Sequence, residues 1–88
     1  LLDAIYQLQA ENIQIVAITE KTEQNIYQAD FSKPTALIMG SEYKGISPSI
    51  LKIADMKAKL PLLGEIESLN VSVACGVALY EVVRQRQN

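Results

Sequence analysis

The 88-residue sequence contains no histidine, no tryptophan and a single cysteine. Without histidine, the chain has no imidazole to act as an acid, a base or a metal ligand, and we expect no metal site. One cysteine excludes an intramolecular disulfide. Cys75 stands among Ala74, Gly76 and Ala78. We therefore expect its thiol to be buried and inert, as in a cytoplasmic protein.

Long apolar runs and clustered cations are also missing. No apolar stretch is long enough to cross a membrane, and polar side chains interrupt the first dozen residues too often for a signal peptide. Eight basic residues face ten acidic ones, for a net charge of −2. A domain that binds phosphates usually carries clustered cations. The only clusters of cationic residues here are Lys52 with Lys57 and Lys59, and Arg84 with Arg86. We therefore do not expect this chain alone to provide the main nucleic-acid-binding surface.

The chain does contain enough apolar material for one small folded domain, residues 1–88, because 49% of its residues are hydrophobic. It begins with Leu1 rather than methionine, and we expect it to be part of a longer protein. Periodicity and the positions of proline and glycine predict, in order, a helix over about the first dozen residues, a strand 13–18, a polar loop 19–33 with one helical turn, a strand 35–39, a helix from 47 to about 54, a strand 56–62, and a helix from 70 to about 87. This order is typical of an α/β fold with a parallel sheet and flanking helices.

Two of these elements have informative composition. Residues 35–39 form a continuous apolar run between Pro34 and Gly40, which predicts a strand buried on both faces. The last helix is apolar almost all the way round, from Val71 to Tyr80. A helix of this kind is not amphipathic, so we expect it to be covered from several sides.

Two longer motifs lie in the second half of the chain. Residues 60–74 read Leu-Pro-Leu-Leu-Gly-Glu-Ile-Glu-Ser-Leu-Asn-Val-Ser-Val-Ala, and residues 79–86 read Leu-Tyr-Glu-Val-Val-Arg-Gln-Arg. Together they resemble the last signature of the SpoU-type RNA ribose 2′-O-methyltransferases, which belong to the SPOUT superfamily of knotted methyltransferases. Residues 36–47, Ala-Leu-Ile-Met-Gly-Ser-Glu-Tyr-Lys-Gly-Ile-Ser, resemble the preceding signature of the same family. The resemblance covers roughly residues 13–86.

The resemblance implies a fold and an activity. The fold would be the SPOUT-type α/β knot, in which the carboxyl-terminal segment is threaded through a loop. The activity would be S-adenosylmethionine-dependent methylation of a ribose 2′-hydroxyl in rRNA or tRNA, by a homodimer. The family's first signature carries an arginine implicated in activating the hydroxyl, and nothing here matches it, because the only arginines are Arg84 and Arg86. We therefore expect this chain to be the carboxyl-terminal, cofactor-binding part of the catalytic domain, truncated on its amino-terminal side.

The resemblance also assigns site residues. The cofactor-binding positions are Gly40, Leu60, Leu62, Gly64 and Leu69. Supporting catalytic roles, shaping the loop and orienting the cofactor and target nucleotide, fall to Glu42, Ser68 and Asn70. Three positions depart from the family pattern: Leu60 replaces the usual isoleucine, Leu62 the usual methionine, and Tyr43 a small residue.

Each assignment has a structural alternative. Residues 40–45 could be no more than a strand-to-helix turn, and they are not a P-loop, because Ile46 stands where lysine is required. Ser68 or Asn70 could simply cap the last helix. Arg84 and Arg86 could be solvated helix-end charges or RNA contacts. For the whole chain, the alternative is a non-catalytic module that uses the same fold for dimerisation or RNA binding.

Overall fold

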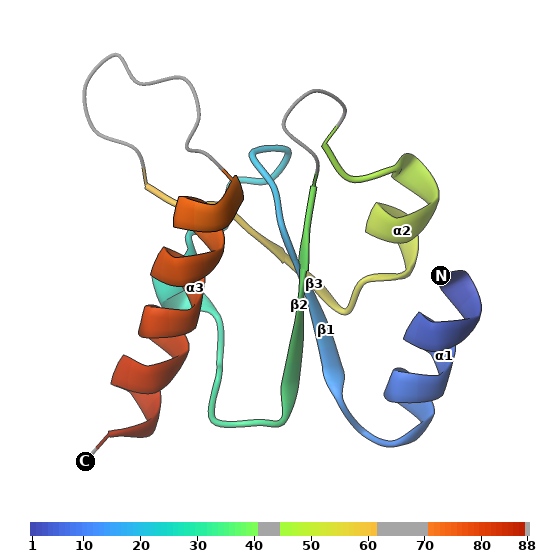
Figure 1. The fold of residues 1–88 in the computed structure, drawn as a ribbon, viewed down its shortest axis with the longest axis horizontal. Coiled ribbons are helices and arrows are strands. Elements are labelled where there is room, and N and C mark those ends of the chain that lie inside the picture. The colour runs from blue at the N-terminus through green and yellow to red at the C-terminus, as the bar shows by residue number, and fades with distance from the viewer. Residues whose placement is uncertain (41–44, 62–70, 88) are drawn as a thin grey trace.

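A computed structural model describes residues 1–40, 45–61 and 71–87. Its elements, in chain order, are α1 (Leu2–Ala10), β1 (Gln14–Ile18), the 3-10 helix η1 (Ile26–Gln28), β2 (Thr35–Met39), α2 (Pro48–Ile53), β3 (Met56–Ala58) and α3 (Val71–Arg86). The order predicted from the sequence is confirmed, including the single helical turn in the polar loop. The sheet lies between two helical layers, with α1 and α2 on one face and α3 with η1 on the other (Figure 1).

The three strands are parallel, in the order β2-β1-β3. The central strand β1 is the one buried on both faces, since Ile15, Val16 and Ala17 are fully buried. The prediction that residues 35–39 are buried on both faces was wrong. All five residues of β2 are half-buried, because β2 lies at an edge of the sheet in the part of the chain that the structure describes.

The third strand is shorter than predicted. It ends at Ala58 rather than at residue 62, because its ladder partner β1 ends at Ile18. The next residue, Lys59, pairs instead with the loop that precedes η1. Its amide donates to the Gln24 carbonyl at 2.8 Å, and its carbonyl accepts from the Ile26 amide at 2.8 Å.

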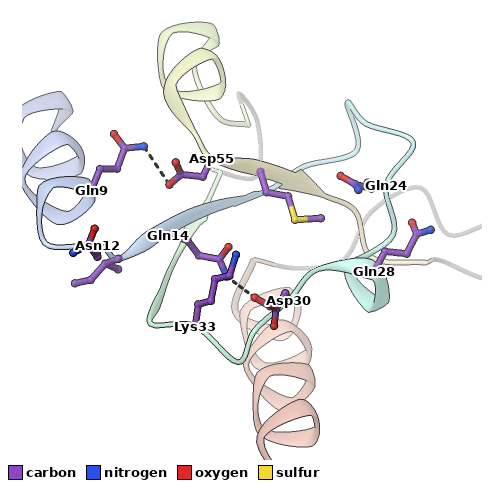
Figure 2. A pocket seen from close by; sticks show the side chains of 10 residues that line it. Gln9, Asn12, Gln14, Gln24, Gln28, Asp30, Lys33 and Asp55 are labelled. Carbon is purple, nitrogen blue, oxygen red and sulfur yellow. Dashed lines mark hydrogen bonds between the residues drawn. The ribbon is translucent and has the colours of Figure 1, made fainter.

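Polar side chains tie the amino ends of the strands together (Figure 2). The Asp55 carboxylate accepts from the Ile15 amide at 2.6 Å, and the Asp55 amide donates to the Ile15 carbonyl at 2.9 Å. Gln9, from α1, donates to the Ile53 carbonyl at 2.9 Å and to Asp55 at 3.2 Å. Asp55 therefore joins α1, β1 and the start of β3.

Helix α1 ends at Ala10. The Ile13 amide donates to the Leu8 carbonyl and the Asn12 amide to the Gln9 carbonyl, both at 3.0 Å, while Asn12 has a φ of 66°. These two bonds and a left-handed residue form a Schellman motif, which stops a helix and turns the chain. Asparagine tolerates the left-handed region better than most residues.

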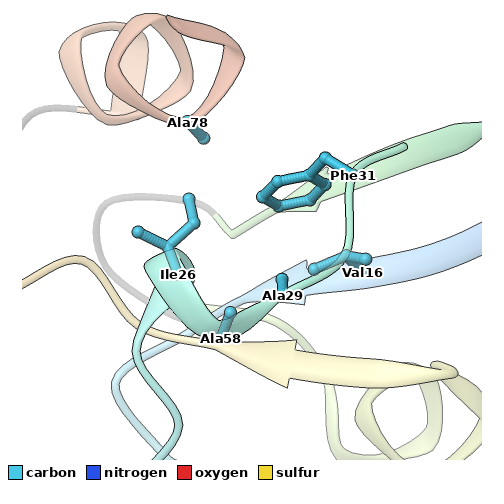
Figure 3. Packing of buried hydrophobic residues seen from close by; sticks show 6 residues of the cluster. All are labelled: Val16, Ile26, Ala29, Phe31, Ala58 and Ala78. Atoms are coloured by element: carbon cyan, nitrogen blue, oxygen red, sulfur yellow. The ribbon is translucent and has the colours of Figure 1, made fainter. Parts of the chain in front are cut away.

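One cluster of core residues lies between the sheet and α3 (Figure 3). It consists of the buried residues Val16, Ile26, Ala29, Phe31, Ala58 and Ala78. Its two bulkiest members, Ile26 and Phe31, come from the segment expected to be a polar loop, and both are fully buried. A capping box holds this segment in place: the Asn25 side chain accepts from the Tyr27 amide at 3.0 Å, and Gln28 accepts from the Asn25 amide at 2.8 Å.

Helix α3 packs against this core through one face only. Ala74, Ala78 and Glu81 are buried, whereas a set of large apolar side chains on the helix is exposed: Val73, Val77, Leu79, Tyr80 and Val83. The prediction that this helix is covered from several sides was therefore wrong for the described chain. Cys75 is partly rather than fully buried. The knot implied by the resemblance depends on residues 62–70, which lie outside the described residues.

Candidate functional site

The residues predicted to bind the cofactor fall into two segments, which begin at Gly40 and at Leu60. Both segments begin at the end of the sheet where the strands have their carboxyl ends. Gly40 directly follows β2, and Leu60 comes two residues after β3 ends. Because the strands are parallel, their carboxyl ends meet at one edge, with β1 between the other two. This edge is where ligands bind in open parallel sheets. Of the other predicted site residues, Glu42, Leu62, Gly64, Ser68, Leu69 and Asn70 lie outside the described residues.

Gly40 is in close contact with the chain that follows it. A Cβ atom added at Gly40 would lie 2.5 Å from the carbonyl carbon of Gly45, 2.6 Å from its Cα and 2.7 Å from the Ile46 nitrogen. Such distances cannot be accommodated without moving backbone. The family resemblance assigns Gly40 to the cofactor, and the structure places the protein's own backbone against it.

Leu60 is anchored by packing. It is half-buried, and its side chain packs against the core cluster that includes Ile26 and Ala58. The start of the second predicted segment is therefore fixed to the same core that supports α3. Neither Gly40 nor Leu60 carries a charge.

The two arginines are bonded within the chain. Arg84 donates from Nε to Glu81 Oε1 at 2.7 Å and from its terminal nitrogen to Oε2 at 2.8 Å. Arg86 donates to the carbonyls of Phe31 and Lys33, each at 2.8 Å. Neither is a free helix-end charge. Bonds from Arg84 hold the pKa of Glu81 below its ordinary value; burial opposes this effect, and a bond from Gln85 adds to it.

An open groove of about 660 Å³ lies elsewhere on the molecule (Figure 2). Most of its lining comes from residues that precede or begin the strands: Gln9, Asn12, Ile13, Gln14, Asp30, Lys33 and Asp55. Several of these groups are already bonded within the chain, since Gln14 donates to the Asp30 carbonyl at 2.6 Å and to Thr35 Oγ1 at 2.9 Å. The groove therefore lies mainly at the opposite end of the sheet from Gly40. Sequence reasoning missed it because its residues come from separate segments and share no motif.

Among residues 1–40, 45–61 and 71–87, no three His, Cys, Asp or Glu side chains gather closely enough to hold a metal ion. In the same ranges, no helix has the length and hydropathy needed to span a membrane.

Comparison with known proteins identifies relatives over nearly the whole chain. Residues 1–80 match the model of the SpoU rRNA Methylase family. The chain is 44% identical over 84 residues to a tRNA (guanosine(18)-2′-O)-methyltransferase from Aquifex aeolicus (strain VF5), covering 94% of this chain and 40% of that protein. It is 42% identical over 80 residues to the 23S rRNA (guanosine-2′-O-)-methyltransferase RlmB of Ralstonia nicotianae, covering 91% of this chain and 32% of that protein. The chain thus spans less than half the length of these relatives.

Solved structures give the same grouping. The crystal structure of the A. aeolicus TrmH/SpoU tRNA modifying enzyme superposes with a TM-score of 0.85 at 41% identity, covering 97% of this chain and 44% of that one. The SpoU methyltransferase AviRb from Streptomyces viridochromogenes, in complex with the cofactor AdoMet, superposes with a TM-score of 0.83 at 32% identity, covering 97% of this chain and 34% of that one. By sequence and by fold, the chain belongs to the SpoU rRNA methylase family.

Proposed function

We propose that this chain is the carboxyl-terminal, cofactor-binding portion of an S-adenosylmethionine-dependent methyltransferase that modifies a ribose 2′-hydroxyl in rRNA or tRNA. The observation that carries the proposal is the position of Gly40 and Leu60, one from each family motif, at the same end of a parallel sheet. The relatives, whose names specify 2′-O-methylation of tRNA and 23S rRNA, support the reaction class.

The described part of the edge fits the adenosyl group of this cofactor. Gly40 follows β2 directly and lies against the backbone of Gly45 and Ile46, and Leu60 is a half-buried aliphatic residue. A mostly apolar site with fixed backbone donors and acceptors suits a purine ring. Gly40 and Leu60, with Leu62, Gly64 and Leu69, would hold the cofactor, which supplies an electrophilic methyl group when bound. Its complex with the family member AviRb supports the assignment.

The residues of this chain would position the cofactor and the target nucleotide, and they would not activate the ribose hydroxyl. A ribose hydroxyl is a weak nucleophile, and transfer from a correctly placed donor still requires a partner for its proton. Glu42 is the only carboxylate assigned to the site, and we place it, with Ser68 and Asn70, in shaping the loop and orienting the cofactor and target nucleotide. The arginine that the family uses at this step has no counterpart between residues 1 and 88.

Binding of RNA would rely on additional residues. The chain has a net charge of −2, and both arginines are bonded to groups within it. Lys21, Lys33, Lys52 and Lys57 are exposed, but they come from four separate segments of the chain rather than from one cationic run. We therefore place most of the RNA contacts in the rest of the protein or in a partner subunit of a homodimer.

Isothermal titration of S-adenosylmethionine into the full-length protein tests the cofactor assignment. We expect saturable binding by the wild type and no detectable binding by Gly40→Val, because its Cβ would displace the backbone of Gly45 and Ile46. Asn12→Gly is the matched control: it lies at the other end of the sheet, already has a φ of 66°, and should bind as the wild type does. A melting curve shows whether each variant is folded. Failure of the wild type to bind would refute the proposal, as would unchanged binding by a folded Gly40→Val.

A further inference from the structure

We propose that Gly45 is a positioning residue for the proposed cofactor site, acting through a backbone clasp that it forms with Gly40. The clasp is defined as the contact of Gly40 with Gly45 and with the Ile46 nitrogen. The inference rests on the proposed function, because Gly40 is the described cofactor-binding residue at the end of β2. It adds a residue to which neither the family resemblance nor the comparisons give a role.

The first observation is the closeness of the contact. The Gly45 and Ile46 backbone occupies the space that any Cβ at position 40 would fill, at 2.5–2.7 Å. The first residue after β2 and the last part of the connection to α2 therefore touch through main chain. A contact of this kind fixes the separation of two backbone segments more tightly than contacts between side chains can.

The second observation is the conformation of Gly45. Its φ is +65°, a left-handed conformation that residues with a Cβ adopt only at a cost in free energy. A Cβ at Gly45 would meet nothing within 4 Å, and the residue is exposed. Position 45 therefore needs glycine because of its backbone conformation, since a side chain there would have room. Position 40 needs glycine because neighbouring backbone leaves no room for a Cβ atom.

The third observation is the anchoring of the residues that follow. Ile46 is buried, at 7% exposure. The Ser47 carbonyl accepts from the amides of Ile50 and Leu51, both at 3.1 Å, and Pro48 sets the first helical position of α2. The chain is thus fixed directly after Gly45. The turn at Gly45 is what allows this anchored segment to lie against Gly40.

These three observations give the clasp a defined effect on binding. A residue that resists a φ of +65° would open the clasp locally while β1, β2 and the core remain folded, because local opening costs less than global unfolding. Gly40 would then be held in place only once ligand is bound, and binding would have to restore the clasp. Part of the free energy of binding would be used to force residue 45 back to a φ of +65°. We therefore expect the affinity for the cofactor to fall about tenfold for a residue such as alanine.

The test compares Gly45→Ala with Gly45→Asn in the full-length protein, using calorimetric titration of S-adenosylmethionine and thermal melting. Both variants add atoms to the same open space, but asparagine tolerates the left-handed region. We expect Gly45→Ala to weaken binding about tenfold and Gly45→Asn to remain within about threefold of the wild type.

Each other outcome overturns the inference. If Gly45→Ala lowers the melting temperature but binds with wild-type affinity, the clasp has only a structural role. If both variants lose affinity equally, the conformation of Gly45 is not what matters. A wild-type protein that does not bind S-adenosylmethionine would instead refute the proposed function, so the two failures are distinguishable.

Discussion

At the scale of single residues, Glu81 shows how buried polarity is arranged in this domain. It is 5% exposed, and its carboxylate accepts two bonds from Arg84 and one from Gln85 at 2.7 Å. Gln85 in turn accepts from the Phe31 amide at 2.8 Å. The network thereby links the last turns of α3 to the loop that supplies Phe31 to the core. A buried carboxylate needs partners of this kind, since an unpaired charge in that position is costly.

This network predicts a dependence of stability on pH. The bonds from Arg84, the largest cause, lower the pKa of Glu81 in the folded protein below its value in the unfolded chain. The stabilisation is therefore complete above the unfolded-state pKa and is lost as the pH falls through the folded-state pKa. Urea unfolding should show Glu81→Gln to be less stable than the wild type at pH 7, with the difference narrowing between about pH 5 and about pH 3. A difference that stays constant over this range would show that ionisation of Glu81 does not contribute.

Some residue roles could be predicted from the sequence and others could not. Gly40 was predicted to bind the cofactor, but its contact with Gly45 and Ile46 was not predicted, because a close approach between two backbone segments leaves no trace in composition. Ile26 and Phe31 were visible as the large apolar residues of a polar loop. Their place at the centre of the core depends on the Asn25 capping box and on the packing of α3, neither of which periodicity reports.

At the scale of elements, periodicity and turn residues predicted the order and type of every helix and strand in the described chain. They did not predict where β3 ends or which strand is central, because both depend on partners distant in sequence. The apolar run of residues 35–39 predicts a strand with apolar side chains. How deeply those side chains are buried depends on which strands and helices lie beside that strand. Residues 62–70 and 41–44 hold six of the eight predicted site residues, and those assignments stay predictions.

The exposed face of α3 predicts self-association. Val73, Val77 and Tyr80 recur at helical spacing along it and are 54%, 44% and 79% exposed. We propose that a second copy covers this face, giving the homodimer that the family resemblance implies. Contiguous apolar surface of this kind on a folded protein usually marks an interface.

Light scattering on the full-length protein checks the prediction. Val77→Glu should raise the dimer dissociation constant at least about a hundredfold, because it would bury an unpaired charge in the interface. Lys52→Glu, on the exposed side of α2, is the matched control and should leave the dimer unchanged. A wild-type protein that stays monomeric over a wide concentration range, or a Val77→Glu variant that dimerises normally, would contradict it.

At the scale of the whole molecule, three features support the proposal that this chain is part of a larger catalytic domain. It spans 40% and 32% of the two relatives compared above. Strand β2 is only half-buried, although its sequence, Thr-Ala-Leu-Ile-Met, suits an interior strand. The apolar face of α3 is uncovered by the described residues. A further strand beside β2 and a partner on α3 would bury both surfaces.

The central claim is that these 88 residues supply cofactor binding while proton removal from the ribose depends on the rest of the protein. Its most direct test is transfer of labelled methyl from S-adenosylmethionine to total rRNA and tRNA, comparing this chain with the full-length protein. Losing a positioned general base typically lowers a rate about a hundred- to ten-thousandfold, and lost RNA contacts would lower it further. We therefore predict label in RNA with the full-length protein and none above background with the 88-residue chain. Turnover by the short chain near the full-length rate would contradict the account and assign proton removal to a residue within it, with Glu42 the first candidate.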